Sequence, residues 1–153
     1  MAKEITIDIE TYSSVDIKKS GVYRYVESSD FEILTMTMSE DANSPITYDL
    51  ASGDELPLET ILDLLNDNVI KWAHNAIFER ICISEWFKRT YPIYYQRYGR
   101  AYLNPICWRC TMALGMYYGL PASLSDMGKV LKLTNQKLEE GKNLIKYFYS
   151  LCE

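Results

Sequence analysis

The first residues of the chain alternate between apolar and polar side chains. Three isoleucines alternate with Thr6 and two acids, in the order Ile5, Thr6, Ile7, Asp8, Ile9, Glu10. Successive side chains of a β-strand point to opposite faces, so the isoleucines share one face and the polar residues share the other. The pattern predicts a strand over residues 3–10 whose apolar face enters a core.

Asp8 and Glu10 lie side by side on the polar face of this predicted strand, near its end. Two carboxylates at this separation repel each other unless a cation lies between them. Their oxygens are the hard ligands that magnesium and manganese prefer. The pair therefore indicates a divalent-metal site, and the alternative is a chance acid triplet on a solvated strand.

A third acid follows a second predicted strand further along the chain. Residues 69–73 are predicted to be a short buried strand, and residues 75–89 a helix with apolar side chains at helical spacing. Asn75 is predicted to be the N-cap, which places Glu79 at the fourth helical position and outside a capping box. An acid just past a strand-to-helix turn faces a site above a sheet, where the helix N-terminus favours negative charge. The alternative is an ordinary first-turn glutamate.

The remaining predicted elements follow an α/β order. Further strands are predicted over residues 31–40, 45–50 and 106–110, and further helices over residues 58–65, 111–118, 123–131 and 137–149. A hairpin turn is predicted at residues 41–44. Three antiparallel strands followed by strands that alternate with helices is an α/β arrangement. With 153 residues and no internal repeat, the chain is predicted to form one domain.

Residues 88–100 contain four cations, four tyrosines and no acid. Cations that contact phosphates and rings that stack on unpaired bases are typical of single-strand binding. Lys88, Arg89, Arg97 and Arg100 are therefore candidate nucleic-acid-binding residues. The alternative is a solvated loop whose tyrosines pack back onto the domain.

The overall charge counts mildly against a general DNA binder and does not exclude an exonuclease. The net charge is −5 and the pI is near 5.0, so no global basic field attracts nucleic acid. An acidic metal site is compatible with this charge, because bound metal ions restore positive charge locally. No apolar run has the length of a membrane span and no cleavable leader precedes the first strand, so we expect a cytoplasmic protein without membrane contact.

The cysteines and the single histidine are expected to have structural roles. In the cytoplasm the four cysteines are expected to be reduced thiols. Cys107 and Cys110 form a lone C-x-x-C, and packing beside a helix is favoured over a zinc site or a redox pair. His74, at a strand end, is expected to be structural and not a general base.

Several segments resemble the DEDD proofreading exonucleases, most closely the exonuclease region of phage-type family A DNA polymerases. IDIETYSSVDIKKSGVYRYVESSDFEIL is similar to the start of those proteins, and DIET matches the first exonuclease motif. NAIFE matches the second motif, with Glu79 in place of the commoner aspartate. CWRCTMALGMYYGLPASLSDMGKVLKL and QKLEEGKNLIKYF resemble their middle region, so the resemblance covers nearly the whole chain.

The resemblance implies a ribonuclease H-like fold and two Mg²⁺ or Mn²⁺ ions on the scissile phosphate. Asp8 would bridge both ions, Glu10 would bind the water-activating ion, and Glu79 would support the other ion. Thr11 and Asn75 would contact the terminal nucleotide or orient the acids. The implied substrate is the 3′ end of single-stranded DNA, and a polymerase domain is the implied partner.

One family feature has no counterpart in the sequence. The third motif, a tyrosine or histidine followed by an aspartate, should lie beyond GKNLIKYF, and residues 149–153 contain no Y-x-x-x-D. We therefore expect an amino-terminal fragment with an incomplete catalytic set, weak metal binding and low or absent activity. Two functions stay open, a 3′–5′ exonuclease and a catalytically silent module that binds single strands or a polymerase; a metal-dependent ribonuclease is a third.

Overall fold

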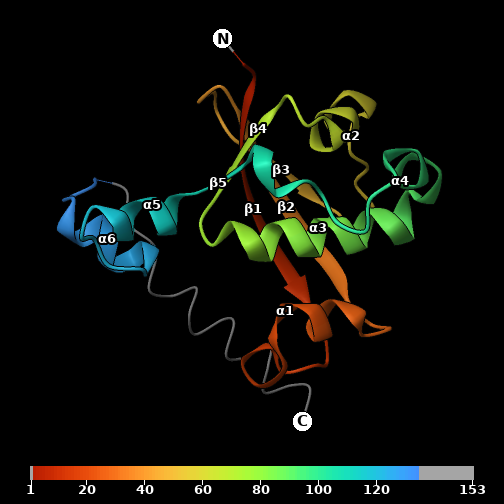
Figure 1. The fold of residues 1–153 in the computed structure, drawn as a ribbon, viewed down its shortest axis with the longest axis horizontal. Helices are drawn as coiled ribbons and strands as arrows, with labels where there is room; N and C mark the ends of the chain where they lie inside the picture. The colour runs from red at the N-terminus through yellow and green to blue at the C-terminus, as the bar shows by residue number, and fades with distance from the viewer. Residues whose placement is uncertain (1, 135–153) are drawn as a thin grey trace. The chain divides into compact units, whose positions relative to one another are not determined.

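The computed structural model describes residues 2–134 and divides the chain into two compact units, Met1–Thr111 and Met112–Glu153. The first unit contains a five-stranded sheet with helices (Figure 1). The helix predicted over residues 137–149 and the segment in which the third motif was expected lie outside the described residues. Within residues 2–134, no helix is both long enough and apolar enough to cross a bilayer.

The sheet of the first unit is mixed. Its strands are β1 (Glu4–Tyr12), β2 (Glu32–Glu40), β3 (Ile46–Asp49), β4 (Ile70–Ala73) and β5 (Trp108–Cys110), in the order β3-β2-β1-β4-β5. The β1–β2 and β2–β3 pairs are antiparallel, and the β1–β4 and β4–β5 pairs are parallel. This confirms the predicted α/β class and is consistent with the ribonuclease H-like arrangement that the resemblance implies.

The helices agree only in part with the sequence prediction. They are α1 (Ile17–Glu27), α2 (Leu58–Leu65), α3 (Ala76–Thr90), α4 (Pro92–Tyr98), the short 3₁₀ helix η1 (Pro105–Cys107), α5 (Thr111–Tyr117) and α6 (Leu124–Val130). The predictions for α2, α3, α5 and α6 are confirmed to within one or two residues. The sequence pattern predicts neither α1 nor α4. Gly21 interrupts α1 with a φ of 77°, and α4 has only seven residues.

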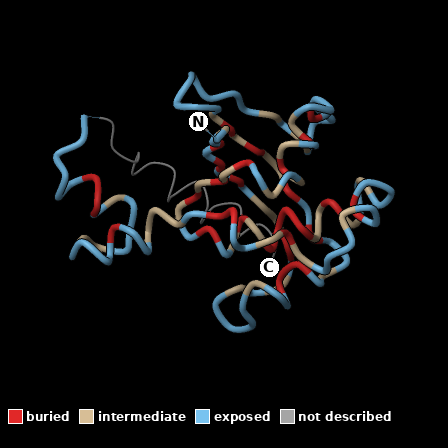
Figure 2. Tube along the Cα trace, turned by 45° about the horizontal axis from the view of Figure 1, so that its top comes forward, coloured by how far each residue is buried: buried red, intermediate tan, exposed pale blue. Residues whose placement is uncertain are grey.

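The hydrophobic core of the first unit joins the sheet to α1, α2 and α3. Ile5, Ile7 and Ile9 are 5%, 2% and 6% exposed, whereas the polar residues between them are exposed, as the alternation predicts. The helix α3 packs against β1, β2, β4 and β5. Figure 2 shows buried residues concentrated along the strands and along α3. The strand β1 therefore presents its acids on the side that the core leaves open.

The predicted hairpin turn connects β2 to β3. Asp41 and Ala42 have φ values of 45° and 62°, and the Asn43 amide donates to the Glu40 carbonyl at 2.8 Å. Two central residues with positive φ suit the right-handed twist of an antiparallel hairpin.

The second unit is described through α5 and α6 alone. The Ser123 hydroxyl caps α6 by accepting a hydrogen bond from the Asp126 amide at 3.5 Å. The Asp126 carboxylate lies 3.8 Å from the Lys129 ammonium. Met127 is buried, and its side chain packs against Gly115.

Candidate metal and nucleic-acid site

Glu79 is a buried carboxylate in the first turn of α3. The residue is 4% exposed, and its Oε2 atom has no hydrogen-bond partner among the described residues. Burial and, to a smaller extent, the nearby Asp8 carboxylate raise the pKa of Glu79 from 4.5 to about 8. The Asp8 carboxylate therefore acts electrostatically on Glu79, although the two candidate acids lie on different elements.

The strand pairing explains how these two acids meet. The strands β1 and β4 are parallel neighbours, and the turn after β4 leads directly into α3. Glu79 is the fourth helical residue, as predicted. The helix α3, whose buried first turn carries Glu79, therefore packs against the strand that carries Asp8.

Asn75 occupies the predicted N-cap position, but its side chain makes no capping hydrogen bond. The Asn75 backbone has a φ of 71° and a ψ of 47°, the left-handed conformation that asparagine tolerates in tight turns. The Asn75 carbonyl accepts a hydrogen bond from the Phe78 amide at 2.8 Å. The residue therefore forms the turn by its backbone.

An irregularity in β1 lies immediately beyond the acidic pair. The pairing of β1 with β2 shifts register between Glu10 and Thr11. Such a bulge redirects the side chains around it and is common beside functional sites. Thr11, just beyond the bulge, is supported by contacts from outside the sheet.

The helix α1 supplies that support. The Thr11 hydroxyl lies 2.9 Å from the hydroxyl of Tyr25, which is 2% exposed, and the Ser13 hydroxyl donates to the Tyr25 carbonyl at 2.9 Å. Sequence reasoning missed Tyr25. The signal that could have indicated α1 is Asp16, whose side chain caps the helix by accepting from the Lys18 amide at 2.9 Å.

The residues around Glu79 fit a divalent cation. A buried carboxylate oxygen without a hydrogen bond is costly, and a second carboxylate beside it adds repulsion. A hard cation with oxygen ligands removes both costs. Asp8 acts electrostatically on Glu79, and Glu10 follows Asp8 two residues later on the exposed side of β1. Among residues 2–134, no three His, Cys, Asp or Glu side chains are grouped as a metal cluster.

The segment with four cations is mostly helical, and three of its four tyrosines, Tyr91, Tyr95 and Tyr98, pack onto the core of the unit. Tyr95 is buried, and its hydroxyl donates to the Ala101 carbonyl at 3.0 Å. The Tyr98 hydroxyl donates to Asp67 at 3.0 Å. This packing agrees with the alternative interpretation of the segment, in which the tyrosines pack onto the domain. Tyr95 and Tyr98 lie on a helix, however, and not in a loop.

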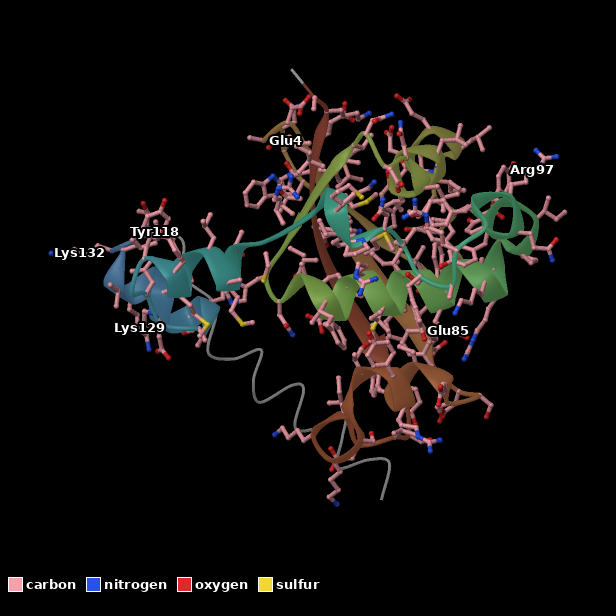
Figure 3. All side chains as sticks on the ribbon, viewed as in Figure 1. Glu4, Glu85, Arg97, Tyr118, Lys129 and Lys132 are labelled. Carbon is pink, nitrogen blue, oxygen red and sulfur yellow. The ribbon has the colours of Figure 1, made fainter. Side chains whose placement is uncertain are left out.

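Three of the four candidate cations contact other groups of the protein. The Lys88 ammonium lies 3.0 Å from Glu85 and 4.5 Å from the centre of the Tyr102 ring. The Arg100 guanidinium lies 3.5 Å from Asp67. Arg97 points outward from α4 (Figure 3). A nucleic-acid role for these residues stays a prediction.

Arg89 links α3 to the end of α1. Its guanidinium donates to the carbonyls of Val26 at 2.7 Å, Ser28 at 3.0 Å and Phe31 at 3.3 Å. It also lies 3.2 Å from Glu85. These contacts give Arg89 a structural role that its sequence context does not indicate.

Replacing Arg89 by alanine is expected to lower the free energy of unfolding by about 1–3 kcal/mol, because three carbonyls lose a charged donor. Arg89→Lys should not restore the loss, since an ammonium lacks the planar fork that reaches several acceptors. Urea unfolding followed by circular dichroism measures the effect. Arg97→Ala, on an exposed residue, is the control and should change stability by less than about 0.5 kcal/mol. Equal losses in both variants would contradict the structural role.

The contacts of Cys107 and His74 agree with the structural roles predicted for them. Cys107 is buried, and its thiol donates to the Asn104 carbonyl at 3.1 Å. Cys107 and Cys110 are free thiols. The His74 Nδ1 atom lies 3.1 Å from the Thr111 hydroxyl.

The strand order and the parallel pairing of β1, β4 and β5 define an α/β protein and are consistent with a ribonuclease H-like arrangement. The chain is similar to a DNA polymerase of Bacillus phage SP02, with 44% identity over 151 residues, which are 99% of this chain and 22% of the polymerase. The chain is thus related to a segment of a phage DNA polymerase and spans only that fraction of its relative's length.

Two further comparisons bear on the fold. No protein-family model matches the sequence. A chain in the structure of the yeast NOT1 MIF4G domain co-crystallized with CAF1 superposes with a TM-score of 0.52 and 9% identity, over 86% of this chain and 69% of that one. At this identity the likeness shows the fold alone.

Proposed function

We propose that the chain is the 3′–5′ exonuclease-type domain of a phage-type DNA polymerase, and that it acts on the 3′-terminal phosphodiester of single-stranded DNA. The observation that carries the proposal is the buried Glu79 carboxylate beside Asp8, with one oxygen lacking a partner among the described residues. These two residues belong to the segments that resemble the first two exonuclease motifs. The 44% identity to a phage polymerase supports the assignment.

The proposed site uses three acids of this chain. Asp8 and Glu10 would hold Mg²⁺ or Mn²⁺ from β1, and Glu79 would hold it from α3. Bound metal ions supply positive charge to the scissile phosphate and lower the pKa of a water molecule. Burial raises the pKa of Glu79, so the ionised form is costly in the absence of a counter-charge. A bound cation would supply that counter-charge and favour the carboxylate.

The neighbours of the acids have orienting roles in this proposal. Thr11 is held by Tyr25 and would fix the direction of the chain just beyond Glu10. Asn75 forms the turn before α3 and thereby fixes where the helix begins, which places Glu79 in its first turn. Both residues would lie beside the terminal nucleotide.

A second candidate function is a catalytically silent module that binds single strands or a polymerase partner. One observation favours it. Within residues 2–134, Asp8 and Glu79 are not joined by a third acid, histidine or cysteine in one cluster. Two acids hold a divalent ion less firmly than a complete ligand set.

Digestion of a 5′-labelled single-stranded oligonucleotide with Mn²⁺ or Mg²⁺ tests the proposal. The expected result is a stepwise ladder from the 3′ end that requires the metal and disappears in Asp8→Ala. A matched RNA oligonucleotide separates deoxyribonuclease from ribonuclease action. A folded sample that leaves both oligonucleotides intact would reject catalysis by this chain and favour the silent module.

A further inference from the structure

A groove of about 770 Å³ lies at the far end of α3 from Glu79. Side chains of α2, α3, α4 and β2 line it, and Figure 1 shows α4 directly after the end of α3. Trp86, in its wall, lies about 10 Å along the helix axis from Glu79 at 1.5 Å per residue. The groove is therefore separate from the acidic site.

One wall of the groove is aromatic. The ring centroids of Trp86 and Tyr91 are 5.3 Å apart and those of Tyr91 and Tyr94 are 6.4 Å apart, both edge to face. Tyr94 is 37% exposed, and Leu58 on the α2 side is 54% exposed. Aromatic faces in such a wall attract cations, because the ring quadrupole is negative above and below the plane.

The same cation chemistry already occurs at one side of the groove. The Arg89 guanidinium lies 5.6 Å from the centre of the Phe31 ring, and both residues line the groove. The donors of this guanidinium are engaged by three carbonyls and Glu85. Arg89 therefore places a guanidinium against another ring of the groove, Phe31, while its own charge is largely compensated.

The rim of the groove is acidic. Glu32, Asp54 and Glu55 line it and are exposed, and none of them forms a salt bridge within the described part of the chain. Burial and, to a smaller extent, Glu55 raise the pKa of Tyr91, which places the Glu55 carboxylate near the aromatic wall. The three acids give the rim a negative surface, because the cation of the lining, Arg89, pairs with Glu85 and with none of them.

We propose that this groove binds a polypeptide segment that presents arginine or lysine side chains between apolar residues. The cationic groups lie over the aromatic faces and pair with Glu32, Asp54 and Glu55. The apolar side chains cover Leu58 and the floor, in a volume that is typical of binding sites. A nucleic acid is a poor occupant, because its phosphates would face three carboxylates.

Fluorescence anisotropy with a labelled peptide of alternating arginine and leucine tests the groove, and a glutamate–leucine peptide of equal length serves as the reference. The double variant Glu32→Gln with Glu55→Gln is expected to bind the arginine peptide about tenfold more weakly, because two charge pairs are lost. Tyr94→Ala is expected to weaken binding as well, by removing one ring face. Thermal unfolding verifies that each variant is folded.

The control is Glu4→Gln with Glu59→Gln, which removes the same charge at positions outside the groove. It should bind the arginine peptide as the unmodified chain does. Two results would overturn the proposal: no binding of the arginine peptide by the unmodified chain, or an equal loss of affinity in the control pair. Each result can be distinguished from failure of the exonuclease assay, because neither metal nor cleavage enters this measurement.

Discussion

Metal-free protein carrying Glu79→Gln is expected to be more stable than the unmodified protein at pH 8, by about 3–5 kcal/mol. The reason is the difference in the pKa of Glu79, which is 4.5 when the side chain is solvated and about 8 in the folded chain. Each pKa unit corresponds to about 1.4 kcal/mol. The folded state binds the extra proton, so the unfolded state binds fewer protons between these two pH values.

The sign of the pH dependence follows from that difference. Because the folded state binds more protons, the free energy of unfolding falls as the pH rises from about 4.5 to about 8 and levels off beyond that range. Glutamine cannot ionise, so Glu79→Gln removes this slope. Urea unfolding at several pH values, with a chelator present, measures it. Glu59→Gln, on an exposed residue, is the control and should keep the slope, and parallel curves for the Glu79→Gln and unmodified proteins would contradict the prediction.

Manganese is expected to stabilise the unmodified chain, by about 2.7 kcal/mol at a concentration one hundred times the dissociation constant. The ion would bind Asp8 and Glu79, and it would displace the proton that burial otherwise keeps on Glu79. Asp8→Asn removes one negative ligand and should reduce the increase in melting temperature to near zero. Thermal unfolding with Mn²⁺ concentrations from zero to saturation measures this.

The control for this prediction is Glu4→Gln, which removes a carboxylate from the same polar side of β1. Glu4 accepts a hydrogen bond from the Trp72 indole at 3.0 Å, a role that the glutamine oxygen can keep. Its manganese response should equal that of the unmodified chain. An undiminished response in Asp8→Asn would contradict a metal site between β1 and α3, whether or not the chain cleaves DNA.

The elements that the sequence predicts well are those with strong local periodicity. The strand β1 alternates strictly, and α3 has apolar residues at helical spacing over fifteen residues. The two unpredicted helices lack such a signal. In α1 the glycine at position 21 departs from helical geometry, and α4 depends on Tyr95 and Tyr98, whose hydroxyls contact groups outside the helix.

The role of Arg89 cannot be predicted from its neighbours in the sequence. Its neighbours in sequence are cations and tyrosines, which are typical of nucleic-acid binding. Its hydrogen-bond acceptors lie about sixty residues earlier, at the end of a helix that the sequence pattern does not predict. Nonlocal contacts of this kind have no signature in a single sequence.

The candidate acids, the strand that carries Asp8 and Glu10 and the helix that carries Glu79 can all be identified from the residues alone. The α/β order can be identified in the same way, because the spacing of the apolar residues differs between the strands and the helices. The burial of Glu79, its oxygen without a partner among the described residues and the influence of Asp8 on it become visible in the folded chain. Burial and pKa depend on which distant elements pack together, here on the parallel pairing of β1 with β4 and the return of α3 across the sheet.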